Sequence, residues 1–129
     1  MSRRVIDSTV FIDASRERRS GSGPAIDFLI AAARDGELWS VTPVRTEVRW
    51  AMRAEETTVV DALFDRVFWL DVTPDLADLA GDFGRRYGRS HGLDVVDALV
   101  AAAAEVLSAD VATTNIRDFP MFPGLIRPY

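Results

Sequence analysis

This chain lacks cysteine and lysine, so all 15 of its basic residues are arginine. The absence of cysteine excludes disulfides and thiolate metal sites, and it permits a reducing cytoplasm. The absence of lysine excludes every mechanism that depends on a lysine amine. His91 is the sole histidine in the sequence, so a histidine-based general acid–base pair is excluded as well.

Hydrophobic runs of membrane-spanning length are also missing. The apolar run at residues 93–106 is too short to cross a bilayer and carries Asp94, Asp97 and Glu105. We therefore expect a cytoplasmic protein without a membrane segment. A length of 129 residues with 48% apolar content suits one domain over residues 1–129. The net charge of −5 argues against general polyanion binding, but arginine clusters and metal ions can still neutralise RNA phosphates.

Short apolar runs alternate with segments of helical periodicity, which is typical of an α/β domain with a mainly parallel central sheet. The polar, glycine-rich stretch 15–23 predicts a loop, and the glycines in 88–92 are expected to break a helix. Thr42 and Thr73 each precede a proline, a pattern that predicts a helix cap. The predicted strands are residues 3–7, 38–41, 67–72, 111–114 and 125–127. The predicted helices run through residues 10–12 and over 24–34, 43–54, 57–66, 74–87 and 93–107.

Four carboxylates occupy positions from which acids are normally excluded. Asp7 ends an apolar strand, and Glu47 lies on the apolar stripe of its helix. Asp97 belongs to a helix that is apolar almost all round, and Asp118 follows another strand. Burying several carboxylates together is costly because they repel one another, and a bound divalent cation would reverse that balance. The pattern therefore predicts a metal site.

All four acids also have an ordinary structural explanation, which for Asp118 is that aspartate is a common turn residue. Asp7 could cap the helix that follows it, and Glu47 could lie at the exposed margin of its stripe. Asp97 could form a capping box with Asp94, although its other neighbours are apolar. For Asp97 the functional interpretation is favoured.

Four blocks in order carry a family resemblance: VIDSTVFID at 5–13, TPVRTEV at 42–48, DALVAA at 97–102 and TNIRDF at 114–119. Together they resemble PIN-domain ribonucleases, most closely the VapC-type toxins of bacterial toxin–antitoxin pairs. The resemblance implies a PIN-like α/β/α sandwich with a mainly parallel central sheet. It also implies an endoribonuclease that uses Mg²⁺, or Mn²⁺, to cleave RNA phosphodiester bonds. An antitoxin partner and a homodimer are implied in the same way.

The resemblance assigns the catalytic quartet to Asp7, Glu47, Asp97 and Asp118. Asp7 and Asp97 would hold the cation, and Glu47 and Asp118 would act directly or through water. Asn115 could supply the last polar ligand in place of Asp118. The expected auxiliary residues are Ser8, Thr9, Asp94, Thr114 and Asn115.

Some arginines are candidates for contacts with the RNA backbone, although solvated helix surface is the favoured explanation for any single one of them. These candidates are Arg16, Arg45, Arg49 and Arg86. A rival interpretation is a non-catalytic PIN-like module that binds a partner protein. Receiver-type and related phosphoryl-transfer domains are disfavoured because they need a lysine. A haloacid-dehalogenase-like phosphatase would need an aspartate where Thr9 stands.

Overall fold

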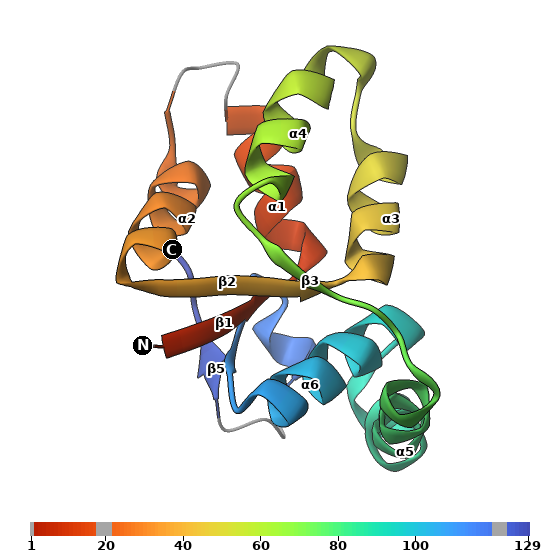
Figure 1. The fold of residues 1–129 in the computed structure, drawn as a ribbon. Coiled ribbons are helices and arrows are strands. Elements are labelled where there is room, and N and C mark those ends of the chain that lie inside the picture. The colour runs from red at the N-terminus through yellow and green to blue at the C-terminus, as the bar shows by residue number, and fades with distance from the viewer. Residues whose placement is uncertain (1, 18–21, 120–123) are drawn as a thin grey trace.

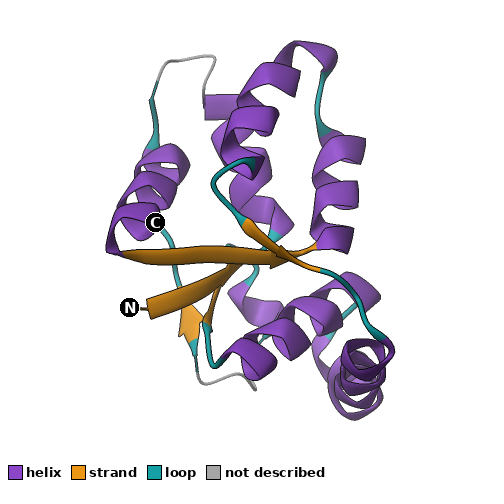
Figure 2. Ribbon diagram, in the orientation of Figure 1, coloured by secondary structure: helices purple, strands orange, loops and turns teal. Residues whose placement is uncertain are grey.

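The computed structural model describes residues 2–17, 22–119 and 124–129, with the backbone alone at 89–91. A sheet of five parallel strands runs through its centre in the order β3-β2-β1-β4-β5 (Figures 1 and 2). The strands are β1 (Ser2–Ile6), β2 (Gly36–Val41), β3 (Phe68–Leu70), β4 (Asp110–Ala112) and β5 (Leu125–Ile126). The predicted α/β class and parallel sheet are confirmed.

Helices cover both faces of the sheet and make an α/β/α sandwich (Figure 1). One face carries α1 (Ser8–Glu17), α2 (Pro24–Asp35), α3 (Thr42–Ala51) and α4 (Thr57–Phe64). The other face carries α5 (Pro74–His91) and α6 (Val95–Leu107). Short 3-10 turns η2 (Ala54–Glu56) and η3 (Ile116–Asp118) complete the described elements.

The core lies against the central strand β1 and its neighbours β2 and β4. Val5 and Ile6 in β1 and Val111 and Ala112 in β4 are completely inaccessible to solvent, as expected for parallel strands covered on both faces. The alanine run 101–104 in α6 is buried as well. Because alanine side chains are small, α6 can pack closely beneath the sheet and bring its first turn to the sheet edge.

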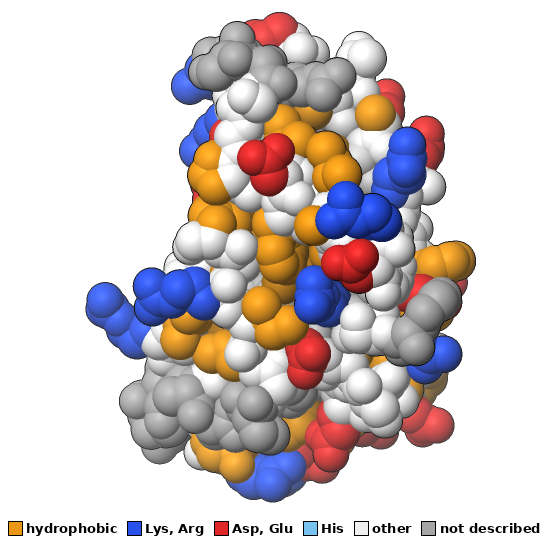
Figure 3. Space-filling view, turned by 90° about the vertical axis from the view of Figure 1, so that its left-hand side faces the viewer, with side chains coloured by type: hydrophobic (Ala, Val, Ile, Leu, Met, Phe, Trp, Pro, Cys, Tyr) orange, Lys and Arg blue, Asp and Glu red, His pale blue; other side chains and the backbone are white. Residues whose placement is uncertain are grey.

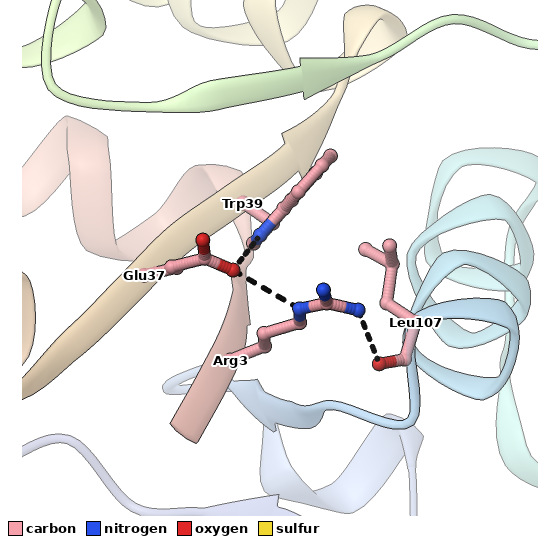
Figure 4. A network of polar contacts seen from close by, with 4 residues as sticks. All are labelled: Arg3, Glu37, Trp39 and Leu107. Carbon is pink, nitrogen blue, oxygen red and sulfur yellow. Dashed lines mark hydrogen bonds and ion pairs between the residues drawn. The ribbon is translucent and has the colours of Figure 1, made fainter. Parts of the chain in front are cut away.

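A polar network lies at the amino end of the sheet, near the start of β1 (Figure 4). Arg3 Nε donates to Glu37 Oε1 at 3.0 Å, and Trp39 Nε1 donates to the same oxygen at 3.1 Å. Arg3 Nη1 also donates to the carbonyl oxygen of Leu107 at 3.4 Å. The hydrogen bond from Trp39 and the neighbouring Arg3 charge hold the pKa of Glu37 below its ordinary value. This network links β1, β2 and the end of α6.

The predicted loop at 15–23 is wrong over its first three residues, because α1 continues to Glu17. Ser15 is buried, and its hydroxyl donates to the backbone carbonyl of Ile12, one turn earlier in the same helix, at 2.7 Å. The carboxylate of Glu17 accepts from the backbone N–H groups of Ala25 and Ile26, each at 2.9 Å, and so caps α2. Residues 18–21 of the predicted loop lie outside the described residues.

Two predicted helix ends are also wrong. Helix α5 continues through Gly88 to His91, since a helical glycine costs only about 1 kcal/mol, and it ends at Gly92 with φ of 71°. Thr42 is the first residue of α3 and not its cap, because the chain is still extended at Val41 and makes no side-chain cap. The cap at Thr73 is confirmed: its hydroxyl oxygen accepts from the Leu76 N–H at 3.2 Å.

Candidate active site

Asp7 follows directly on β1 and is only 1% exposed. Its backbone N–H donates to the Ala112 carbonyl at 3.0 Å, which continues the pairing of β1 with β4. Three donors hold the carboxylate: the Ser8 N–H at 2.8 Å, the Thr113 hydroxyl at 2.7 Å and the Thr9 hydroxyl at 3.3 Å. Asp7 does precede α1, but a usual cap bonds the second or third helical N–H group, and this carboxylate bonds the first. The carboxylate is therefore buried and fixed in orientation.

Thr113 is a residue that sequence reasoning missed. It is fully buried just after β4, and its hydroxyl oxygen accepts from the Asn115 N–H at 2.9 Å while donating to Asp7. The Thr9 hydroxyl links the same loop, since it accepts from the Thr114 N–H at 3.3 Å and donates to Asp7. The alternation of side chains along a strand, counted from buried Val111, could have identified Thr113. Together the two threonines bind the loop after β4 to Asp7.

Asp94 and Asp97 begin α6 and form a reciprocal capping box. The Asp97 N–H donates to Asp94 Oδ1 at 2.8 Å, and the Asp94 N–H donates to Asp97 Oδ2 at 3.4 Å. The structural explanation of this pair is therefore confirmed. The Asp97 side chain also lies in the acidic cluster, and the residue is only 8% exposed. One carboxylate thus serves both to cap the helix and to add charge to the cluster.

Electrostatics show which acids are brought together. Burial raises the pKa of Asp7, hydrogen bonds from Thr113, Ser8 and Thr9 lower it in part, and the charge of Asp94 raises it further. Burial also raises the pKa of Glu47, which a hydrogen bond from Ser8 lowers and the charges of Asp7 and Asp94 raise.

The pKa of Asp97 is raised as well. Burial, followed by the charges of Asp94 and Asp7, raises its pKa from 3.8 to about 7, and Asp118 adds to the effect. Asp118 closes η3 beside the start of α6: a Cβ added at Gly92 would lie 3.9 Å from Asp118 Oδ1. All five acids therefore lie within one electrostatic neighbourhood, at or beyond the carboxyl ends of the strands. Ligands of open α/β sheets gather at this edge.

Comparison with known proteins identifies the family. The model of the PIN domain matches residues 4–123. The chain belongs to the PIN-domain family.

Two curated relatives of this PIN domain come from Mycobacterium tuberculosis. Ribonuclease VapC19 is 41% identical over 128 residues, which are 98% of this chain and 99% of that protein. Ribonuclease VapC10 is 36% identical over 126 residues, which are 97% of this chain and 92% of that protein. Both relatives therefore match this chain over nearly its full length.

Solved structures share the PIN-domain fold. A toxin–antitoxin complex from Klebsiella pneumoniae matches with a TM-score of 0.77 at 20% identity, over 98% of each chain. DNA-bound VapBC from Salmonella typhimurium matches with a TM-score of 0.76 at 18% identity, over 97% of this chain and 96% of that one. At these identities the likeness concerns the fold alone.

The acids of this PIN domain fit a hydrated, hard cation. Within the described residues, no arginine forms an ion pair with Asp7, Glu47, Asp97 or Asp118, so their charges lack such compensation. In the same part of the chain, no three acidic or histidine side chains are close enough to enclose a metal ion by themselves. Magnesium ordinarily uses one or two carboxylates and keeps several waters, so such an enclosure is not needed. The donor set suits magnesium or manganese better than a metal that requires a full protein cage.

Of the arginines predicted to contact RNA, two connect α3 to α4. The Arg45 guanidinium lies 4.7 Å from the Phe64 ring centre and 4.8 Å from that of Trp69. Arg49 lies 4.8 Å from the Phe64 ring centre and pairs with Asp61 at 2.8 Å. These contacts give both side chains a packing role.

The other two predicted RNA-binding arginines are exposed. Arg86 on α5 lies over the rings of Phe83 and Tyr87, and Arg16 is in the last turn of α1. Binding of RNA by these side chains stays a prediction.

No helix in the described ranges is long and apolar enough to cross a membrane.

The raised pKa of Asp97 predicts a pH-dependent stability of the metal-free protein. Because the folded state keeps a proton that the unfolded state loses, stability should fall as pH rises from about 4 to about 7. Asp97→Asn removes the buried negative charge, which is desolvated and repelled by Asp94 and Asp7, and it keeps an oxygen for the capping box. We expect the variant to melt about 3 to 6 °C above wild type at pH 7.5 in EDTA, and close to wild type at pH 4.

Thermal unfolding followed by circular dichroism at both pH values measures this difference. Asp78→Asn, on the exposed surface of α5, is the control and should melt with wild type at both. If Asp97→Asn raised the melting temperature equally at pH 4 and pH 7.5, the buried charge of Asp97 would not be the cause of the increase.

Proposed function

We propose that this PIN domain is a metal-dependent endoribonuclease and the toxin of a toxin–antitoxin pair. The observation that carries the proposal is the gathering of Asp7, Glu47, Asp97 and Asp118 at the carboxyl edge of the sheet. Burial, with a smaller contribution from neighbouring carboxylates that include Asp94, raises the pKa of Asp7, Glu47 and Asp97, and a bound cation would offset this cost. Near-full-length similarity to two ribonucleases supports RNA as the substrate.

Asp7 and Asp97 would hold the cation, Mg²⁺ or Mn²⁺, with Glu47 and Asp118 binding it directly or through water. When bound, such a cation polarises a phosphate and makes a water molecule more acidic. Thr9, Thr113 and the Ser8 N–H keep the Asp7 carboxylate in one orientation, so no rearrangement is needed when substrate arrives.

The remaining acids supply proton transfer and orientation. Glu47 has a raised pKa, which suits a group that accepts the proton of the attacking water. Asp94 keeps the Asp97 side chain in place through the capping box. Asp118 stands on a turn beside Gly92 and is positioned to orient water from the far side of the cluster.

An apolar groove supplies a surface for the antitoxin. It has a volume of about 580 Å³ and lies between α1, α2, β2 and α4; Figure 3 shows this side of the molecule, with apolar side chains along its middle. Ile26, Leu29 and Ile30 line it on the α2 side, and Arg34 and Arg66 add positive charge. An amphipathic helix with acidic flanks fits such a groove.

None of the four proposed catalytic acids lines this groove. The antitoxin segment in the groove and the catalytic site would therefore occupy different surfaces. Structural neighbours that are toxin–antitoxin complexes support an antitoxin partner. A homodimer is proposed from the family resemblance.

The proposal is tested by incubating the purified protein with a mixed RNA pool in Mg²⁺, in Mn²⁺ and in EDTA. We expect cleavage into discrete fragments with either metal, none in EDTA, and recovery when metal is added in excess. Cleavage that continues unchanged in EDTA would contradict the metal dependence. A complete lack of cleavage, with an antitoxin still bound, would favour the non-catalytic interaction module.

A further inference from the structure

Trp50 is the most exposed large apolar side chain in the described part of the chain, at 87% accessible. Tryptophan ordinarily buries a large area, so its full exposure is costly unless a ligand covers it. A single exposed apolar residue is unremarkable by itself. Trp50 is of interest because it lies close in sequence to Glu47, one of the clustered acids, and on the same helix.

Trp50 lies one helical turn after Glu47 on α3. Side chains three residues apart on a helix are neighbours, with Cβ atoms about 5–6 Å apart. Helical side chains also lean toward the helix N-terminus, so the indole leans toward the turn that contains Glu47. Because α3 starts where β2 ends, that direction is the carboxyl edge of the sheet, where the acids gather.

Val95 on α6 is a second exposed apolar side chain close to the acids, on the face of the sheet opposite to α3. It is 76% exposed and is the first residue of α6, between Asp94 and Asp97. Helices α3 and α6 cover different faces of the sheet (Figure 1). The acidic cluster therefore has an exposed apolar side chain on each side, with the aromatic one on α3.

The surroundings of Trp50 favour a nucleobase over a protein partner. Thr46 and Ala51 are exposed beside it, and the only apolar side chains buried on α3, Val44 and Val48, face the core. Protein docking on a helix needs a continuous apolar stripe, which this exposed face lacks. Base stacking needs one accessible ring, and it tolerates polar neighbours because the phosphates lie beside the base.

We propose that Trp50 stacks on a nucleobase of the RNA substrate beside the scissile phosphate and so contributes to substrate selection. The inference rests on the proposed ribonuclease function and names a residue that holds the substrate. Stacking holds RNA before and during cleavage alike, so its loss should raise KM more than it lowers kcat.

The test compares steady-state cleavage of one labelled RNA, chosen from the pool that wild type cuts, by five proteins in Mn²⁺. These are wild type, Trp50→Ala, Trp50→Phe, Phe68→Ala and Asp7→Asn, which serves as the catalytically inactive reference. Phe68 is the control because it is also an exposed aromatic residue, at 52%, but it opens β3 away from the carboxyl edge. We expect Trp50→Ala to lower kcat/KM roughly 5- to 150-fold, mainly through KM. Trp50→Phe should retain most of the activity, and Phe68→Ala should match wild type.

Each other outcome overturns the inference in a recognisable way. If wild type cleaves, Asp7→Asn does not, and Trp50→Ala equals wild type, then the stacking role is wrong and the ribonuclease function stands. If light scattering shows that Trp50→Ala converts a dimer to a monomer, the indole belongs to an interface between copies. If wild type is as inactive as Asp7→Asn on every RNA tested, the proposed function and this inference fail together.

Discussion

Asp7→Asn should reduce RNA cleavage by roughly 1000-fold, the largest loss expected for any single substitution in this chain. Asparagine has the shape of aspartate but lacks the negative charge that attracts a cation. Asp7 is 1% exposed, and the amide oxygen of asparagine can still accept from the Ser8 N–H while its NH2 group faces the Thr9 and Thr113 hydroxyls, which can accept as well as donate. Cleavage of labelled RNA in saturating Mn²⁺ measures the effect.

A matched control distinguishes the effect of changing the proposed catalytic site from the effect of removing one negative charge anywhere on the protein. Asp78→Asn removes one negative charge from the exposed surface of α5 and should cleave RNA at the wild-type rate. Circular dichroism should show that both variants are folded. Cleavage by Asp7→Asn within threefold of wild type would remove Asp7 from the catalytic site and leave the proposed mechanism without its central ligand.

Ile30→Asp should weaken binding of the antitoxin by about 100-fold, which is the size of a hot-spot loss at a protein interface. Ile30 lines the apolar groove and is 60% exposed, so the substitution should change the groove without disturbing the core. A carboxylate there must be desolvated when an apolar helix docks. Titration calorimetry with the antitoxin measures the change in affinity.

Val106→Asp is the matched control for that experiment. Val106 is an aliphatic residue near the end of α6, is 59% exposed, and does not line the groove. It should bind the antitoxin as wild type does, and both variants should cleave RNA normally. Equal losses for the two variants, or none for Ile30→Asp, would place the antitoxin on another surface.

Much of the architecture could be predicted because local patterns and tertiary packing agree. Pro24 suits the first turn of α2, Gly36 follows the helix where a Cβ would lie only 2.1 Å from the Ser2 carbonyl oxygen, and Thr73 caps α5. The strand positions followed from short apolar runs that are buried on both faces. The errors at Ser15 and Glu17 arose because side-chain hydrogen bonds override composition: both residues are polar and yet helical, since Ser15 bonds within α1 and Glu17 caps α2.

The contacts around the acids were anticipated only in part: Ser8, Thr9 and Asp94 were expected beside them, and Thr113 was missed. Asp7 and Asp97 stand out because a carboxylate in an apolar context is costly, and that signal is visible in the sequence. Thr113 gives no such signal, since a threonine at a strand end has many ordinary uses. Its bond to Asp7 depends on β1 and β4 being neighbours, which the order of the chain does not reveal. The double use of Asp97, in the cap and in the cluster, could likewise be seen only in three dimensions.

The central place of β1 has a consequence for synthesis. β1 pairs with β2 from the first half of the chain and with β4 from the second, and Asp7 is held by Thr113 across the latter pair. A growing polypeptide that has emerged only as far as α4 carries Asp7 and Glu47 but neither Asp97 nor Asp118. The acidic cluster therefore forms only after Asp97 and Asp118 have emerged from the ribosome. Under the proposed function, a growing chain that ends before these residues should not cleave RNA.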